Sequence, residues 1–138
     1  MASKIATKGD KLQLSIASVY TDIPQVKSLR GPAPKVQIFD GTALDSGVGM
    51  EHKVTGYTDG GTVSFTVFFD PANSVHKALL AIATTPAISL WKRIFSDSGA
   101  TTWPFSGCVT SPPNPSADVN GALMADCEIT LDGIPTYP

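Results

Sequence analysis

The stretch TVSFTVFF, residues 62–69, decides the fold class of this 138-residue chain. Its apolar side chains Val63, Phe65, Val67 and Phe69 recur at every second position. Because successive side chains of a β-strand point to opposite faces, this alternation predicts a strand with one buried face. Phe68 falls on the opposite, otherwise polar face. An apolar ring there indicates that a helix or another subunit covers that face.

The same two-residue period continues on both sides of this strand and predicts a mainly β protein. Five further segments are predicted as strands, and they are residues 11–16, 35–39, 88–95, 103–110 and 123–131. In residues 35–39 the alternation places Val36 and Ile38 inward. Gly107 interrupts the pattern of its segment and indicates a bulge.

One segment has the pattern of a helix. Asn73 or Ser74 supplies the N-cap, and an apolar stripe at helical spacing follows, formed by Val75, Leu79 and Ile82. The helix is expected to end before the next proline, which removes a hydrogen-bond donor. A β-sandwich or partly closed barrel with one short α-helix packed on its side is therefore predicted, as a single domain over residues 1–138.

Two long connections are predicted between strands. Residues 41–61 contain many glycines and little periodicity, so they are expected to form a long loop that projects from the sheet. Residues 111–121 carry three prolines and are expected to form a plain surface loop.

The charge distribution is uneven along the chain. The net charge is −2, which argues against a protein that binds nucleic acid through phosphate contacts. Residues 1–35 nevertheless have a net charge of +4. The segment after Arg93 contains five carboxylates and no Lys or Arg. This polarity fits head-to-tail stacking of identical subunits. It fits equally well the pairing of neighbouring strands within one molecule.

No catalytic motif, cofactor site or metal site is predicted, and the chain is not expected to be an enzyme. His52 lies in the long loop and His76 in the first helical turn, where a solvated side chain is expected. Cys108 and Cys127 lack zinc-ligand spacing and are expected to be thiols rather than a disulfide. Asp126 and Glu128 lie about 7 Å apart on one strand face, which is better explained as an exposed polar face than as an acid pair.

A longer run, GYTDGGTVSFTVFFDP at residues 56–71, resembles a signature of the tail tube proteins of long-tailed, non-contractile bacteriophages. In that family a Gly-x-x-Asp-Gly-Gly turn leads into an alternating strand that ends in Asp-Pro. A short helix that begins near a histidine follows, matched here by residues 75–80. The segments 23–32, 42–46 and 133–135 are also similar to the family, so the resemblance covers nearly the whole chain in order.

The resemblance implies a subunit that assembles into stacked, six-membered rings around a channel for the genome. It implies a homo-oligomer whose further partners are a tape-measure protein, a tail tip and a tail terminator. DNA would pass through the lumen without specific binding, and no cofactor is involved. The location implied is the tail of the virion, after assembly in the host cytoplasm. No membrane span, signal peptide or appended C-terminal domain is expected from the sequence.

The family also suggests which residues join the subunits. The long loop and a flexible N-terminal arm, residues 1–10, would bridge adjacent rings. The residues that this assigns to contacts between rings are Lys4, Lys8, Asp45, Met50, Glu51, His52 and Lys53. A channel for DNA favours a polar or acidic lining, so we expect Asp126, Glu128 and Phe68 to lie at the lumen or at a seam between subunits. The alternative is a monomeric β-sandwich that binds carbohydrate or a protein partner through Trp91 or Trp103.

Overall fold

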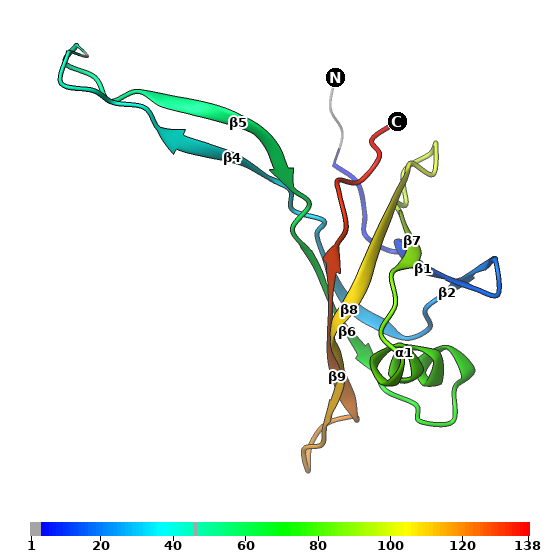
Figure 1. Ribbon diagram of the computed structural model, residues 1–138. Helices are drawn as coiled ribbons and strands as arrows, with labels where there is room; N and C mark the ends of the chain where they lie inside the picture. Colours follow the sequence, from blue (N-terminus) through cyan, green and yellow to red (C-terminus); the bar gives the residue numbers. More distant parts are fainter. Residues whose placement is uncertain (1–3, 46) are drawn as a thin grey trace.

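The computed structural model describes residues 4–45 and 47–138 of the chain, in which one short helix accompanies a set of β-strands (Figure 1). The helix α1 spans Ser74–Thr84. The strands are β1 (Lys11–Ile16), β2 (Val19–Asp22), β3 (Val26–Arg30), β4 (Lys35–Asp40), β5 (His52–Asp59), β6 (Thr62–Phe68), β7 (Ser89–Ile94), β8 (Thr102–Ser116) and β9 (Met124–Leu131). The prediction of a mainly β fold with one short helix is confirmed.

Seven of these strands form one antiparallel sheet in the order β2-β1-β7-β8-β9-β6-β3. The long strand β8 belongs to both halves of this sheet. Its residues 102–107 pair with β7, and its residues 107–116 pair with β9. The sheet does not close into a barrel, and β4 and β5 form a separate two-stranded hairpin.

The hydrophobic core draws on both halves of the sheet and on the helix. Leu12, Leu14 and Trp91 come from the β1–β7 half, while β6 and β9 supply the alternating apolar residues that the sequence predicts. The helix adds Val75 and Leu79. The buried residues of β6 and β9 are Val63, Phe65, Val67, Ala125, Cys127, Ile129 and Leu131.

Gly107 is the point at which β8 changes its neighbour. It pairs with Ser89 on one side and with Leu131 on the other, and its carbonyl accepts a hydrogen bond from Trp91 Nε1 at 3.1 Å. A Cβ atom at this position would lie 2.5 Å from the Thr130 carbonyl oxygen. The register shifts of β8 lie further along, between Val109 and Asn114, so Gly107 marks a close approach of two backbones rather than the bulge that the sequence suggested.

The prediction of a plain loop over residues 111–121 is wrong for its first half, which continues β8 to Ser116. Proline lacks the N–H that a central strand needs and is confined to edges and bulges. Here Pro112 and Pro113 lie within the register shift against β9 between Ser111 and Asn114, whereas Pro115 pairs in register with Ala125. Pro113 is buried. The bulges therefore allow a proline-rich segment to remain a strand.

The helix begins as predicted, but its histidine is not solvated. Asn73 is the N-cap, and its side chain accepts hydrogen bonds from the backbone N–H groups of Val75 and His76. His76 is fully buried. Its Nδ1 accepts a hydrogen bond from the Asp70 N–H at 3.0 Å, and its Nε2 lies 3.1 Å from the Pro24 carbonyl oxygen. The imidazole therefore joins the segment before β3 to the segment before the helix, a structural role.

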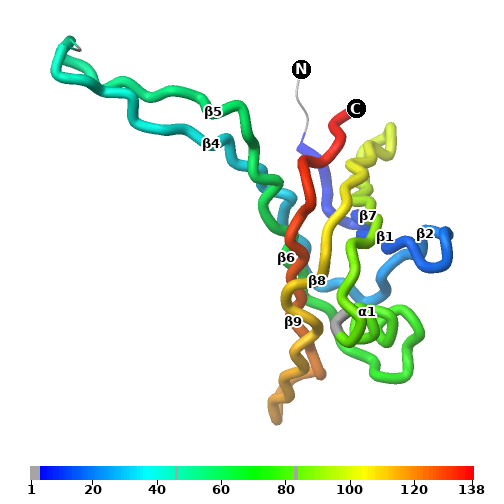
Figure 2. The backbone as a smooth tube through the Cα atoms, viewed as in Figure 1, coloured from blue at the N-terminus to red at the C-terminus, as the bar shows by residue number. Residues whose placement is uncertain are grey.

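The prediction of a structureless loop over residues 41–61 is also wrong, because β5 fills its second half. It pairs with β4 from Lys35 opposite Asp59 to Asp40 opposite His52. The connecting loop is therefore limited to residues 41–51. The hairpin does project from the sheet, as Figures 1 and 2 show. We call residues 35–59 the arm.

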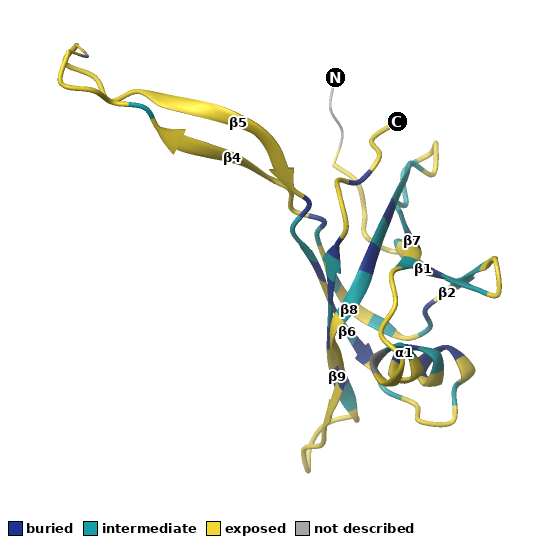
Figure 3. Cartoon of the chain, in the orientation of Figure 1, coloured by how far each residue is buried: buried dark blue, intermediate teal, exposed yellow. Residues whose placement is uncertain are grey.

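The inward placement of Val36 and Ile38 is wrong for the same reason. Every residue of β4 and β5 is exposed (Figure 3). The arm leaves the body of the molecule at Gly60 and Gly61. A Cβ atom on Gly61 would lie 2.2 Å from the Ala33 carbonyl oxygen, so the two chains of the hairpin are pressed together at its base.

Candidate functional site

The arm is closed at its far end by short-range hydrogen bonds. The Gly41 N–H donates to the Glu51 carbonyl at 2.8 Å, and the Thr42 hydroxyl accepts from the Glu51 N–H at 2.7 Å. The Thr42 N–H donates to Asp40 Oδ1 at 2.9 Å. Hydrogen bonds from Thr42 lower the pKa of the Asp40 carboxyl, so this group is ionised at neutral pH.

The arm exposes an unusual number of apolar side chains, and no other described part of the chain covers them. They are Val36 (52% exposed), Ile38 (57%), Phe39 (52%), Leu44 (109%), Val48 (110%), Met50 (70%), Val54 (68%) and Tyr57 (78%). Single exposed apolar residues are common, whereas a contiguous set marks a surface that a partner covers. The arm is therefore the first candidate surface.

The two faces of the arm differ in charge. Ile38 lies opposite Val54, and Asp40 and His52 follow on the same face. We call this the Ile38 face. On the other face, Phe39 lies opposite Lys53.

The structure brings together most of the residues that the sequence assigned to contacts between subunits. All of them are exposed, and those on the arm are Asp45, Met50, Glu51, His52 and Lys53. Lys4 and Lys8 belong instead to the N-terminal segment. This segment lies beside the body and away from the arm (Figure 1). Residues 1–3 of this segment lie outside the described part of the chain.

The N-terminal segment is attached to the body at its end. The Asp10 carboxylate accepts a hydrogen bond from the Ser96 N–H at 2.9 Å and forms an ion pair with Arg93 at 3.7 Å. Arg93 also donates to the Gly31 carbonyl. This arginine therefore fixes the base of the N-terminal segment and the end of β3 to β7.

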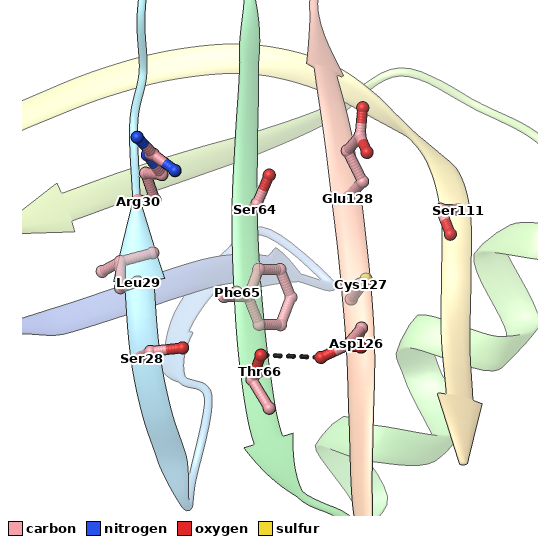
Figure 4. Close-up of a pocket in the computed structure, with 10 residues that line it drawn as sticks. All are labelled: Ser28, Leu29, Arg30, Ser64, Phe65, Thr66, Ser111, Asp126, Cys127 and Glu128. Carbon is pink, nitrogen blue, oxygen red and sulfur yellow. Dashed lines mark hydrogen bonds between the residues drawn. The ribbon is translucent and has the colours of Figure 1, made fainter. Parts of the chain in front are cut away.

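A polar sheet surface is the second candidate. It lies on the side of β3, β6, β9 and β8 that faces away from the core, and we call it the polar face (Figure 4). The register places Arg30, Ser64, Glu128 and Ser111 in one row. A second row contains Ser28, Thr66, Asp126 and Asn114. All of these residues except Asn114, together with Leu29, Phe65 and Cys127, line a depression of about 430 Å³.

Asp126 and Glu128 lie on this polar face, as the sequence predicts for the strand side opposite the core. The Thr66 hydroxyl donates to Asp126 Oδ1 at 2.7 Å (Figure 4). Lys27 is also close to this surface, since its Nζ lies 3.7 Å from the Met124 sulfur. Two cations, Lys27 and Arg30, thus accompany the two acids.

Phe68 lies at the end of the polar face, opposite Met124, and is 38% exposed. The helix packs on the core side of the sheet through Val75 and Leu79. Of the two covers expected for Phe68, the helix is therefore excluded.

Open strand edges flank the polar face. β3 is the last strand of the sheet on one side. On the other side β7 pairs with β8 only as far as Gly107. Beyond that residue, the outer edge of β8 has no strand partner in the described part of the chain. Unpaired edges carry free N–H and C=O groups that favour pairing with another strand.

The tryptophans do not offer the flat platforms on which a carbohydrate-binding module would depend. Trp91 is fully buried and stacks on Phe105. Trp103 is half-buried and makes T-shaped contacts with the rings of Phe95 and Tyr137. The centroids of these rings lie 4.8 and 4.7 Å from the centroid of Trp103. Both tryptophans serve packing.

Both cysteines are free thiols, and they differ in environment. Burial raises the pKa of the Cys127 thiol to about 12, whereas Cys108 is half-buried. We expect a Cys108→Ser variant to resist labelling by a thiol reagent at pH 8, because the reactive thiolate of Cys127 is scarce there. Mass spectrometry of folded and urea-unfolded samples measures this difference. Labelling at equal rates in both samples would contradict it.

The same pKa shift gives a pH dependence with a defined sign. The thiol ionises near pH 9.0 when unfolded and near 12 when folded. Its contribution to stability is therefore complete below pH 9 and is lost as the pH rises toward 12.

Within the part of the chain that the structure describes, no cluster of three or more His, Cys, Asp or Glu side chains is arranged to hold a metal ion. No helix in residues 4–45 or 47–138 is both long and apolar enough to cross a bilayer.

Comparison of the sequence with protein-family models gave no match, and no curated protein matched it either. Several solved structures do match the fold. The tail of an empty gene transfer agent particle, refined with C6 symmetry, aligns with a TM-score of 0.77 and 16% identity over 98% of this chain and 99% of that chain. The SPP1 tail tube aligns with a TM-score of 0.74 and 12% identity over 98% and 80%.

A third match is the baseplate of the anti-feeding prophage, with a TM-score of 0.74 and 10% identity over 96% of this chain and 94% of that chain. All of these identities are low, so the likeness concerns the three-dimensional structure. The chain shares the fold of these tail components over nearly its whole length.

Proposed function

We propose that this chain is the structural subunit of a phage tail tube. Copies of the chain self-assemble into stacked rings around a channel for the genome. The observation that carries the proposal is the exposed apolar arm on a fold shared with tail components. An isolated monomer would leave this arm in water, whereas a second copy would cover it.

Ring formation uses the open edges beside the polar face. In the proposed ring, β3 of one copy lies next to the outer edge of β8, beyond Gly107, in its neighbour. Each neighbour then satisfies backbone groups that one copy leaves unpaired. An interface of this head-to-tail type closes into a ring when its rotation allows it. We propose six copies, the symmetry of the gene transfer agent tail.

The polar face lines the channel in this arrangement. It carries hydroxyl and amide groups, and its two cations, Lys27 and Arg30, balance its two acids, Asp126 and Glu128. A lining without net charge gives DNA no electrostatic reason to bind as it passes. Phe68, at the end of this face, is assigned to the seam between neighbours.

Stacking uses the arm and the N-terminal segment, which place Lys4, Lys8, Asp45, Met50, Glu51, His52 and Lys53 at the junction between rings. Homo-oligomerisation is the primary interaction. A tape-measure protein, a tail tip and a tail terminator are the further partners proposed, with assembly in the host cytoplasm and a final location in the virion tail. No catalytic role is proposed.

Electron microscopy of the concentrated, purified protein tests the function. Rings or tubes of uniform diameter with a central channel are expected, together with sedimentation far faster than that of a 14.4 kDa monomer. A protein that remains monomeric at every concentration up to the millimolar range would contradict the proposal.

A further inference from the structure

A shallow groove lies on the outer face of the β1–β7 half of the sheet. Tyr20, Leu90, Pro104, Ser106, Ile134 and Thr136 line this groove, whose volume is about 230 Å³. We call it the outer groove. Leu90 is 54% exposed and Ile134 is 58% exposed. The chain thus has an exposed apolar depression in addition to an exposed apolar arm.

The outer groove is held rigidly by the C-terminal segment. The Asp132 N–H donates to the Ser106 carbonyl at 2.8 Å, and the Thr136 N–H donates to the Pro104 carbonyl at 3.0 Å. Pro135, between them, is buried. Ile134 is consequently fixed as one wall of the groove before any partner arrives, which lowers the entropic cost of binding.

One cation accompanies the outer groove. Lys92 follows Leu90 by two positions on β7, on the same face of the strand. Its Nζ lies 3.9 Å from the centroid of the Tyr20 ring, which lines the groove. The ammonium group is therefore positioned beside the apolar depression.

We propose that the outer groove receives the Ile38 face of the arm of a second copy of this chain. On β4, Ile38 and Asp40 are two positions apart on one face, as Leu90 and Lys92 are on β7. Both pairs are separated by about 7 Å, the spacing of alternate residues in a strand. Seating Ile38 on Leu90 therefore brings the ionised Asp40 carboxylate to the Lys92 ammonium.

The charge of each arm face selects between the two possible orientations. The Ile38 face presents Asp40, whereas the opposite face presents Lys53 beside Phe39. A groove that carries Lys92 attracts the first face and repels the second. The arm projects away from its own body (Figure 1), so the groove that it occupies belongs to another molecule.

This inference rests on the proposed function and adds the surface that receives the arm. Ile38→Ser and Leu90→Ser variants test it, with Val119→Ser as the control because Val119 is an exposed apolar residue that belongs to neither the arm nor the groove. We expect each of the first two substitutions to raise the concentration needed for tube formation about tenfold or more, since each removes one buried apolar side chain. The control is expected to change that concentration less than about twofold.

A charge exchange tests the orientation. Lys92→Glu alone is expected to weaken assembly, and the pair Asp40→Lys with Lys92→Glu to restore it. Asp40→Asn separates charge from hydrogen bonding, because the amide oxygen still accepts from the Thr42 N–H. Recovery in the double variant identifies the contact, and failure to recover assembly would overturn it.

Crosslinking gives a readout that does not depend on stability. A Cys108→Ser chain that also carries Ile38→Cys and Leu90→Cys is treated with a short bis-maleimide after assembly. A ladder of covalent oligomers is expected, and the same chain with Phe39→Cys in place of Ile38→Cys should give none. Normal tubes without the ladder would overturn this inference and leave the proposed function intact, whereas an unsubstituted protein that forms no tubes would contradict the proposed function itself.

Discussion

Replacing residues 41–51 by Asn-Gly is expected to abolish tube formation while leaving a folded monomer. Asp40 and His52 are paired across the hairpin, so a two-residue turn closes the shortened arm without changing its register. The replacement removes Leu44, Val48 and Met50, which are among the most exposed apolar residues of the chain. Among the removed residues that the structure describes, none belongs to the core.

Electron microscopy and sedimentation measure the loss of assembly, and circular dichroism with thermal unfolding measures the retained fold. A chain with Gly47→Ser and Gly49→Ser provides the control, because a Cβ atom at either glycine meets no atom within 4 Å. This control keeps the length and apolar content of the loop and should assemble normally. The prediction fails if the shortened chain still builds tubes, or if it no longer folds.

Gly107→Ala is expected to cause a large loss of stability for a substitution that adds one methyl group. The new methyl group would lie 2.5 Å from the Thr130 carbonyl oxygen, 3.0 Å from Ile129 Cγ2 and 3.2 Å from Leu131 Cα. Two of these three atoms are backbone, so the clash can be relieved only by separating β8 from β9. A decrease of about 3 kcal/mol in the free energy of unfolding is expected.

Urea unfolding of the monomeric, shortened-arm protein measures this change free of assembly effects. Gly99→Ala is the matched control, because a Cβ atom there meets nothing within 4 Å. Its effect should stay within about 0.5 kcal/mol. Equal stability of the two alanine variants would show that β8 and β9 are less closely packed at Gly107 than described.

The parts of the fold that the sequence predicts are those in which one strand face is buried. β6 and β9 bury every second residue, so their alternation is visible in the sequence. β5 was missed because both of its faces are exposed, which removes the signal on which the prediction depends. The same exposure explains the wrong inward placement of Ile38. The sequence of β4 alternates between polar and apolar residues there, but neither face of the strand packs on a core.

Other features depend on contacts that are distant in sequence. His76 is buried because the Pro24 carbonyl, 52 positions away, meets its imidazole. The second half of β8 was not predicted because it is rich in prolines, two of which lie within a register shift against β9. For the candidate surfaces, alternation placed Asp126 and Glu128 on the polar face correctly. The outer groove could not be predicted, because Leu90 and Ile134 meet only through the pairing of the C-terminal segment with β8.

The strand pairing within the arm is interrupted at one point, and this interruption would affect how a long tube bends. Between Val36 and Ile38 the register of β4 against β5 shifts, and Gly56 adopts a φ of +89° there with open space around it. The ladder is therefore weakest between the base of the arm and its tip. Rings joined through such linkers would take up curvature at these joints, so a tube would bend as a jointed chain of stiff discs and keep its bore open.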